Sequence, residues 1–570
     1  MRLFSGGTIL TMDTAHPRAE ALAIADGRIV AVGDAAHVRA AAPKSEEVSL
    51  DGGCLLPGFI DAHHHFSEGA FFASTSNLHW PAVRSVADIL RVLSTRAAET
   101  PPGQWIIGEG YDERRLSELR TPTLAELDVA CPNHPVLLVH FSYHEAVVNS
   151  LAHEAVEVPL HRADPPGGEV VYDRRGRPTG RMIENAAAPF YMGAIRQVLV
   201  PDEVGYFERL DRYQARLFAA GITRVYDPAV SPTMEHMLAR AVERSVLRVP
   251  VLMMPSSDDG TFMPPRDRLD GARTGDGSGL LRTGPLKLFM DGGQRAAFRV
   301  PLHIAAAAAL RTTRRALGSW SLTPFWNAAS VPMRLDPLAW CVRGGILFYS
   351  EREALEMVEA AVRRGMSVAV HAEGNVAIER TLRVLPRSRR DRAPGVGPNR
   401  IEHFFFSNAD AIERAAGLEL AIAVQPTILE WIGDQVLDTG LDSWLAFMPL
   451  RRMLAAGLTV AGSSDAPVVD FDPLVGIRAA VRRRTASGEA LADGQELTID
   501  QALQMYTLNA ARSGGLEHEA GVLAPGKSAD LVVLSTDPTA LSVDDLDRLV
   551  VERTICGGTE VYRRPAAPAR

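Results

Sequence analysis

Two histidines stand two residues apart at the end of an apolar segment. The segment begins at Leu56 and leads through Asp61 into His63, His64 and His65. Successive side chains of a β-strand point to opposite faces, so His63 and His65 should share a face that His64 does not. Two imidazoles that converge at the end of a buried strand can hold one divalent ion. The alternative is a surface cluster or a tag remnant, but a tag would lie at a terminus without an apolar strand before it.

Four further residues of ligand or proton-transfer type stand in or directly after apolar runs. They are Lys287, His371, His403 and Asp465. Each has a structural alternative, namely a hydrogen-bonded core histidine, a paired lysine or an aspartate that caps a turn. A lysine inside an apolar strand is costly unless it is paired or modified. Taken with His63 and His65, these residues predict one shared metal site.

The elements that must position these residues alternate between strand-like and helical patterns. Helical patterns such as 201–220, 351–364 and 449–456 separate most of the expected strands. The strands are expected to end near Asp61 and to lie at 222–227, 248–253, 285–290, 366–371, 400–403, 418–425 and 458–465. Eight such units predict an α/β fold, a (β/α)8 TIM-like barrel whose active residues stand at the carboxyl ends of the strands. All six residues except Lys287 lie at or near those ends.

Both ends of the chain have the pattern of a β domain. Asp26-Gly27 and Gly557-Gly558 are turn signals between short β-like runs. We therefore expect residues 1–54 and 515–570 to form one composite β-sandwich. Residues 55–514 would form the barrel.

Two long insertions interrupt the expected barrel, at about 67–200 and 292–350. Loops of that length are usually binding loops, lids or disordered segments. The second insertion is rich in aromatic residues, which favours an ordered apolar surface. We expect its residues 294–345 to cover the barrel mouth and to influence the choice of substrate.

Composition excludes several classes of protein. Of the 570 residues 46% are hydrophobic and 23% charged, with a net charge of -9, which is a soluble profile without the basic surface of a nucleic-acid-binding protein. The N-terminus has no signal-peptide pattern, and no run is long enough to span a membrane. The four cysteines are widely spaced, which fits a reducing cytoplasm better than a disulfide framework.

The motifs resemble those of the amidohydrolase superfamily, in particular the branch of N-substituted formamide deformylases (amidohydrolase family 3). The resemblance spans nearly the whole chain and is carried by PGFIDAHHH at 57–65, KLFMDGG at 287–293, HAEGN at 371–375, RIEHF at 400–404, GSSDAP at 462–467 and GVLAPGKSADLVVL at 521–534. It departs from the branch at Asn375, where aspartate is usual, and at Tyr111, where tryptophan is usual.

The resemblance implies a role for each residue of the predicted site. His63, His65, His371 and His403 would be metal ligands, and Lys287, when carboxylated, would bridge two metals. In the alternative with one metal, Lys287 stays an ammonium and acts as an electrostatic stabiliser. Asp465 would be both a ligand and the catalytic proton shuttle. Zn²⁺ is the expected metal, with iron or manganese also compatible with the ligands.

Weaker candidates for substrate binding follow from the branch pattern or from positions beside strand ends. They are Tyr111, His144, Asn149, Asp291 and Gln425. Asn149 has the alternative of starting a helix, because asparagine is a favoured N-cap. Asp291 has the alternative of orienting the ligands from behind.

The implied reaction is hydrolysis of a small-molecule amide-type C–N bond, of N-formyl or N-acyl kind, by attack of metal-bound hydroxide. Zinc lowers the pKa of its water from about 15.7 to around 7, which makes hydroxide available at neutral pH. Hydrolysis of a cyclic amide, carbamate or ester is the alternative chemistry. A non-catalytic binding protein is the alternative of another class, although such relatives tend to lose ligands that are all present here. The family resemblance also implies a homodimer.

Overall fold

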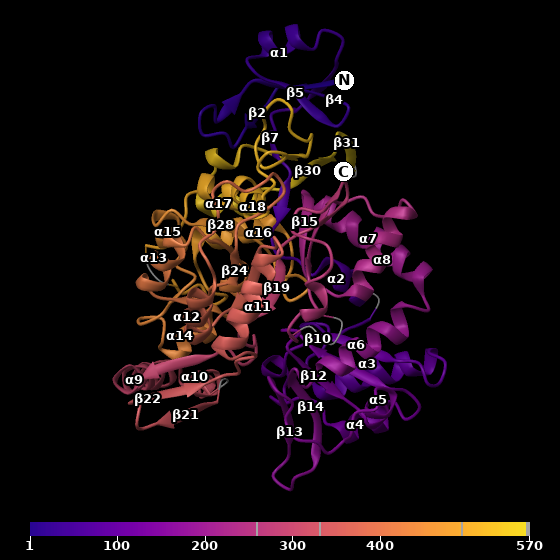
Figure 1. Ribbon diagram of the computed structural model, residues 1–570, viewed down its shortest axis with the longest axis vertical. Coiled ribbons are helices and arrows are strands. Elements are labelled where there is room, and N and C mark those ends of the chain that lie inside the picture. Colours follow the sequence, from indigo (N-terminus) through magenta and orange to yellow (C-terminus); the bar gives the residue numbers. More distant parts are fainter. Residues whose placement is uncertain (74, 258–259, 261, 330–331, 492–493, 566–570) are drawn as a thin grey trace.

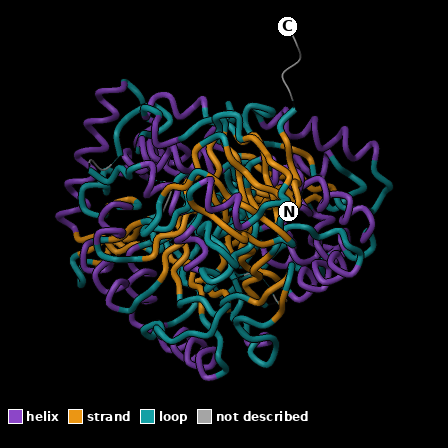
Figure 2. Tube along the Cα trace, turned by 90° about the horizontal axis from the view of Figure 1, so that it is seen from above, coloured by secondary structure: helices purple, strands orange, loops and turns teal. Residues whose placement is uncertain are grey.

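The computed structural model describes residues 1–73, 75–257, 260, 262–329, 332–491 and 494–565, and the chain is a mixed α/β protein. Figure 1 shows a β-rich region built from both chain ends at one extreme, an α/β middle, and two lobes at the other extreme. Seen from above in Figure 2, strands gather in the middle and helices lie mostly around them.

The middle contains two parallel sets of strands. The first consists of β8 (Phe59–Asp61), β15 (Ile222–Val230), β16 (Val251–Pro255) and β18 (Leu281–Thr283), with β17 (Gly277–Ser278) antiparallel at its edge. The second consists of β19 (Leu286–Phe289), β23 (Val368–Ala372), β24 (Arg400–His403), β26 (Ala421–Val424) and β28 (Thr459–Gly462). Apart from two half-buried residues of β18 and one of β28, the parallel strands are buried throughout, as expected for parallel strands covered on both faces.

The two sets are joined at both pairs of edges, by the chain itself at one and by backbone hydrogen bonds at the other. Only Gly284 and Pro285 separate β18 from β19, and the N–H of Gly284 donates to the carbonyl of Met253 at 2.6 Å. At the opposite edges Ala62 N donates to Gly462 O at 3.3 Å and Asp465 N donates to His63 O at 2.8 Å. The first and last strands of the α/β middle therefore lie next to each other, and this contact brings the histidine stretch to Asp465.

The helices expected between strands are present within a few residues of their expected bounds. They include α7 (Glu203–Ala219), α11 (Glu351–Arg363) and α15 (Leu450–Ala455). The start of α11 is fixed by a capping box, in which Ser350 accepts from Glu353 N and the Glu353 side chain accepts from Ser350 N.

Both chain ends contribute strands to one six-stranded sheet. In it β7 (Cys54–Pro57) runs parallel to β2 (Thr8–Leu10) and antiparallel to β29 (Leu531–Leu534), which pairs in turn with β30 (Val551–Cys556). A second sheet, made of N-terminal strands alone, has the order β5-β4-β1-β6 and contains β1 (Arg2–Ser5), β4 (Ala21–Ala25), β5 (Arg28–Gly33) and β6 (Glu46–Ser49).

The two insertions form the two lobes of Figure 1. The first contains a sheet with the order β13-β14-β12-β11-β10-β9, in which β12 (Glu145–Val148) pairs with β14 (Pro178–Glu184). Its other strands are β9 (Ser76–Asn77), β10 (Ile106–Tyr111), β11 (Val136–His140) and β13 (Gly168–Tyr172). The second contains an antiparallel sheet of β20 (Phe298–Pro301), β22 (Cys341–Gly344) and β21 (Met333–Asp336), with helices α9 (Leu302–Ser319) and α10 (Thr323–Ala328). Its outer surface is also apolar, since Trp320 is 96% and Trp340 75% exposed.

No helix in the described part of the chain combines the length and the hydropathy needed to cross a membrane. The cysteines are unpaired: Cys54, Cys131 and Cys341 are buried, and Cys556 is partly exposed.

Candidate metal centre

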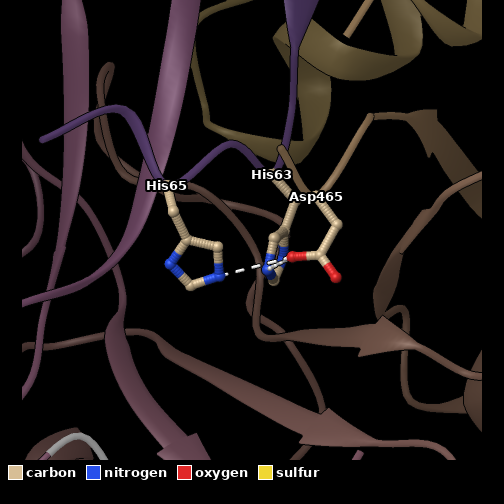
Figure 3. Close-up of side chains that lie close together, drawn as sticks. All are labelled: His63, His65 and Asp465. Atoms are coloured by element: carbon tan, nitrogen blue, oxygen red, sulfur yellow. Dashed lines mark ion pairs between the residues drawn. The ribbon is translucent and has the colours of Figure 1, made fainter. Parts of the chain in front are cut away.

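His63, His65 and Asp465 meet at the junction of the first and last strands of the α/β middle (Figure 3). One carboxylate oxygen of Asp465 lies 3.2 Å from Nε2 of His63 and 3.3 Å from Nε2 of His65. His64 points elsewhere, with its ring nitrogens 3.0 Å from Asp61 Oδ2 and 2.9 Å from the Tyr213 hydroxyl. Strand β8 ends at Asp61, as expected. The histidines therefore lie in the loop after the strand, although the expected alternation of their side chains assumes that they belong to the strand itself. The alternation of their side chains nevertheless persists.

A buried carboxylate orients His63. Nδ1 of His63 contacts Glu402 Oε2, and Glu402 is held by Arg400, whose Nε and Nη2 donate to its oxygens at 2.5 and 2.9 Å. Arg400, Glu402 and His63 are all buried. A histidine whose Nδ1–H donates to a carboxylate presents Nε2 as a lone pair, which is the usual arrangement behind a metal ligand.

His371, His403 and Lys287 face the same small cavity. Its volume is about 50 Å³, and all six predicted ligands line it. His403 Nδ1 lies 2.9 Å from Gln425 Oε1, which fixes that ring as well. His371 Nε2 and Lys287 Nζ are buried and have no hydrogen-bond partner among the described residues.

Two of these residues have unusual backbone conformations. His403 has φ of 74° and Asp465 has φ of 63°, in the left-handed region that non-glycine residues seldom occupy. Such positions persist when the surrounding structure over-determines them, and they cluster at functional sites. Here the left-handed conformations, at the last residue of β24 and three residues after the end of β28, aim the two side chains into the shared cavity.

The electrostatics favour neutral imidazoles at His371 and His403 and a charged carboxylate at Asp465. At His65 burial alone would lower the pKa, but the hydrogen bond to Asp465 and the charge of Glu68 raise it. Burial, reinforced by the charges of His403 and His144, holds the pKa of His371 well below its usual value, and burial lowers the pKa of His403 to about 3 although Asp465 opposes it. Burial alone would raise the pKa of Asp465, but the neighbouring His63 and His65 hold it well below its ordinary range. Neutral imidazole and ionised carboxylate are the forms that bind a cation.

The donor set therefore fits a divalent metal. The buried, unpartnered nitrogens of His371 and Lys287 lack the partners that buried polar groups normally have. The ligand atoms fall into two groups, His63–His65–Asp465 and His371–Glu373–His403, and within each group they lie within 4.8 Å of one another. All members of the two groups except Glu373 line the small cavity, and this arrangement is compatible with one or two cations.

A much larger cavity adjoins the metal centre. It has a volume of about 1090 Å³ and is lined by both insertions, by Glu373 and by Asp465. Its apolar wall includes Phe141, Phe298 and Trp431. Among the described residues Ser142, His144, Asp465 and Val468 line both cavities, so the large cavity opens onto the small one between them.

Of the five weaker candidates for substrate binding, only His144 lines the small and the large cavity. Tyr111 is buried, with its hydroxyl 3.4 Å from Glu145. Asn149 is the N-cap of α5 (Ser150–Ala155), where its Oδ1 accepts from Ala152 N and Val136 N. Tyr111 and Asn149 serve the packing of the first insertion here.

Asp291 and Gln425 act on neighbouring residues of the site. Asp291 accepts from the backbone N–H groups of Ala297, Glu373 and Gly374, so it fixes the loops after β19 and β23. Gln425 holds His403 and donates to Ser463 Oγ at 3.0 Å. Both are buried behind the cavity wall, and neither lines a cavity.

Three acidic residues of the site were not singled out from the sequence. Glu402 and Glu373 stand beside predicted ligands in RIEHF and HAEGN, so adjacency was a usable signal. Glu184, which contacts His144, lies 40 residues away in sequence, and only strand pairing brings the two together.

Comparisons with known proteins agree with this geometry. The amidohydrolase family model matches residues 46–562. The chain is 29% identical to an N-substituted formamide deformylase of Arthrobacter pascens, over 98% of this chain and 97% of that protein. It is 27% identical to the putative amidohydrolase YtcJ of Bacillus subtilis, over 99% of each.

A solved structure supports the fold. An uncharacterized metal-dependent hydrolase from Pyrococcus horikoshii OT3 has a TM-score of 0.70 at 23% identity, covering 95% of this chain and 99% of that one. The family resemblance of the motifs is thus confirmed along nearly the whole sequence, and the chain belongs to the amidohydrolase family.

Proposed function

We propose that this protein is a metal-dependent hydrolase that cleaves an amide-type C–N bond of a small molecule, of N-formyl or N-acyl kind. The observation that carries the proposal is the small cavity in which six ligand-type residues converge with unpartnered nitrogens. The similarity to an N-substituted formamide deformylase favours an amide substrate. The adjoining cavity of about 1090 Å³, partly walled by aromatic side chains, fits a bulky N-substituent.

The proposed architecture is a closed (β/α)8 barrel at 55–514 with a composite β-sandwich from 1–54 and 515–570. Closure is supported because the chain continues from β18 into β19 at one pair of edges and hydrogen bonds link the ends of β8 and β28 at the other. The shared sheet of β2, β7 and β29 supports one terminal domain. Within the barrel, the metal ligands and Asp465 stand at or next to strand ends.

The residues would divide the work as follows. His63, His65, His371, His403 and Asp465 would hold the metal. Lys287 would bridge two metals if carboxylated, and as an ammonium it would instead act as an electrostatic stabiliser. When bound, the cation supplies a nucleophile at neutral pH and polarises the scissile carbonyl. Asp465 takes the proton of the nucleophile and delivers it to the leaving nitrogen.

Zinc is the proposed metal because imidazoles and carboxylate suit it, and the same ligands would accept iron or manganese. Further expectations are a cytoplasmic location and a homodimer. Exposed apolar side chains of the second insertion, such as Trp320 and Trp340, are the surface to examine for self-association by light scattering.

The test is a screen of N-formyl amines, N-acyl amines, cyclic amides, carbamates and esters on protein loaded with zinc, manganese or iron. We expect one to two equivalents of bound metal and turnover of N-formyl or N-acyl compounds with an apolar N-substituent. Turnover confined to cyclic amides, carbamates or esters would show that the substrate belongs to that class and is not an N-formyl or N-acyl amine. Metal content well under half an equivalent, with no activation by added metal, would refute the proposal.

A further inference from the structure

A histidine–glutamate pair from the first insertion reaches the junction between the two cavities. His144 immediately precedes β12, and Glu184 is the last residue of β14, its antiparallel neighbour. Nδ1 of His144 lies 2.6 Å from Glu184 Oε2. The His144 ring also stacks on Phe262, with centroids 5.0 Å apart, and its centroid is 5.4 Å from that of His371.

The position of Glu184 is fixed independently of His144. Its side chain is fully buried, and its Oε1 accepts from the N–H groups of Gln294 and Arg295 at 3.1 Å each. Its backbone has φ of 51°, and its own N–H donates to the His144 carbonyl at 2.7 Å. These bonds leave Oε2 for the imidazole.

The neighbouring glycines permit this close approach. A Cβ at Gly292 would stand 2.2 Å from Glu184 Oε1, and a Cβ at Gly293 would stand 2.7 Å from the His144 ring. Gly293 N–H also points at His144 Nδ1, at 3.2 Å, but Glu184 Oε2 is nearer at 2.6 Å, so we take Glu184 as the main partner of Nδ1. The other ring nitrogen, Nε2, has no partner among the described residues.

We propose that His144 is a catalytic residue that works with both ring nitrogens protonated: Nδ1–H is held by Glu184, its positioning residue, and Nε2–H donates to the substrate's carbonyl oxygen as that oxygen becomes an oxyanion. This role rests on the proposed function. Apart from Asp465, His144 is the only ionisable residue that lines both cavities in the described part of the chain, so a carbonyl that enters the small cavity passes beside it.

The proposed step is balanced without a further reactant. Water oxygen bonds to the carbonyl carbon, the C=O π pair moves to oxygen, and this oxyanion accepts the hydrogen bond from Nε2. The electron pair on the oxyanion then re-forms the C=O bond, the C–N bond breaks, and the leaving nitrogen takes the proton that Asp465 received from the water. An imidazolium paired with a carboxylate has no net charge, and this pairing reduces the free-energy cost of burying the charged donor.

Two substitutions separate this role from a structural one. In His144→Asn the side-chain amide can still donate to Glu184, but nothing replaces Nε2. In His144→Gln the amide nitrogen occupies the place of Nε2. His161→Asn, an exposed position of the same insertion, is the control. We measure kcat, KM, metal content, Tm and the Kd of methylphosphonate, a tetrahedral oxyanion, on metal-loaded protein.

We expect His144→Asn to lose at least about a hundredfold in kcat, as for loss of one oxyanion donor, with KM and metal content nearly unchanged. Methylphosphonate should bind at least about tenfold more weakly to it, while His144→Gln should lie between it and the parent. If His144→Asn matches the parent in kcat and in methylphosphonate affinity, His144 has only a structural role and the proposal is wrong. A metal-loaded parent that neither turns over any screened compound nor binds methylphosphonate refutes the proposed function and this role together.

Discussion

At the scale of single residues, the site separates groups that hold position from groups that can react. Glu402 and Gln425 bind the outer nitrogens of His63 and His403, so the inner nitrogens have fixed directions. Asp465 instead contacts two imidazoles through one oxygen. Its second oxygen belongs to neither contact, which suits a carboxylate that must both bind and exchange a proton.

The proton-transfer role of Asp465 can be tested by an isosteric change. Asn in place of Asp465 keeps the size and an oxygen donor but is a far weaker base. We expect Asp465→Asn to lose at least about a hundredfold in kcat while it keeps most of the metal and the fold. His63→Ala should instead lose metal first and activity as a consequence. Turnover of Asp465→Asn within a few-fold of the parent would move the proton-transfer role to another residue.

Carboxylation of Lys287 should depend on pH. Burial lowers the pKa of Lys287 to about 8, although Glu402 and Asp465 oppose the shift. Only the neutral amine reacts with CO2, and its fraction grows as pH rises toward the lowered pKa. At constant dissolved CO2, reconstitution of apoprotein with zinc should accelerate about tenfold between about pH 6.5 and about pH 8. A rate that is independent of CO2 at every pH would identify Lys287 as an unmodified ammonium.

At the scale of elements, the second insertion forms part of the wall of the large cavity. Phe298 of β20, Ala308 and Thr312 of α9, and Trp326 of α10 line the large cavity. The insertion is tied to the chain core by Arg315, which pairs with Asp438 at 2.8 Å. Substrate choice should therefore depend on the inner face of this insertion and not on its outer face.

Two tryptophans of the insertion test this dependence. Trp326 lines the cavity, whereas Trp320 does not and is 96% exposed. Trp326→Ala should lower kcat/KM about tenfold for substrates with a bulky N-substituent and little for small ones, because apolar contact in a pocket is worth about 1–3 kcal/mol. Trp320→Ala should leave kcat/KM unchanged for both. If the two variants have the same kcat/KM values across the substrate series, the insertion does not influence substrate choice.

At the scale of the whole molecule, strands from the two chain ends share one sheet next to the α/β middle. The fully buried Leu531 of β29 pairs with Pro57 of β7, in the strand that leads to β8 and the histidine stretch. Thr554 of β30 donates to the carbonyl of Phe218 at the end of α7. The C-terminal strands therefore stabilise the start of the site although they lie far from it in sequence.

This coupling gives a stability prediction. Leu531→Ala should lower the free energy of unfolding by about 2–5 kcal/mol, because it removes buried methyl groups and leaves a cavity. Val30→Ala in β5, at a position 40% exposed, should change it by less than about 0.5 kcal/mol. Urea unfolding followed by fluorescence and by loss of metal measures both. A separate early transition that leaves metal binding intact would show that the terminal sheet unfolds independently.

The local sequence determined which residues could do chemistry and which family they belong to. Ligand-type residues recur after apolar runs in motifs that the family model matches, so His63, Lys287 and Asp465 could be named without a structure. The helices also lay close to their expected bounds, because capping and amphipathic spacing are local properties. These features are readable from sequence because each depends on residues only a few positions apart.

Only the tertiary structure decided how distant segments meet. Nothing near His144 in sequence indicates Glu184, because the pairing of β12 with β14 sets that contact. The same holds for the large cavity, whose wall both insertions help to form. It also holds for Tyr111 and Asn149, which pack within the first insertion and do not line that cavity. Burial and register arise from long-range packing, so the pattern could propose these residues as substrate contacts but could not place them.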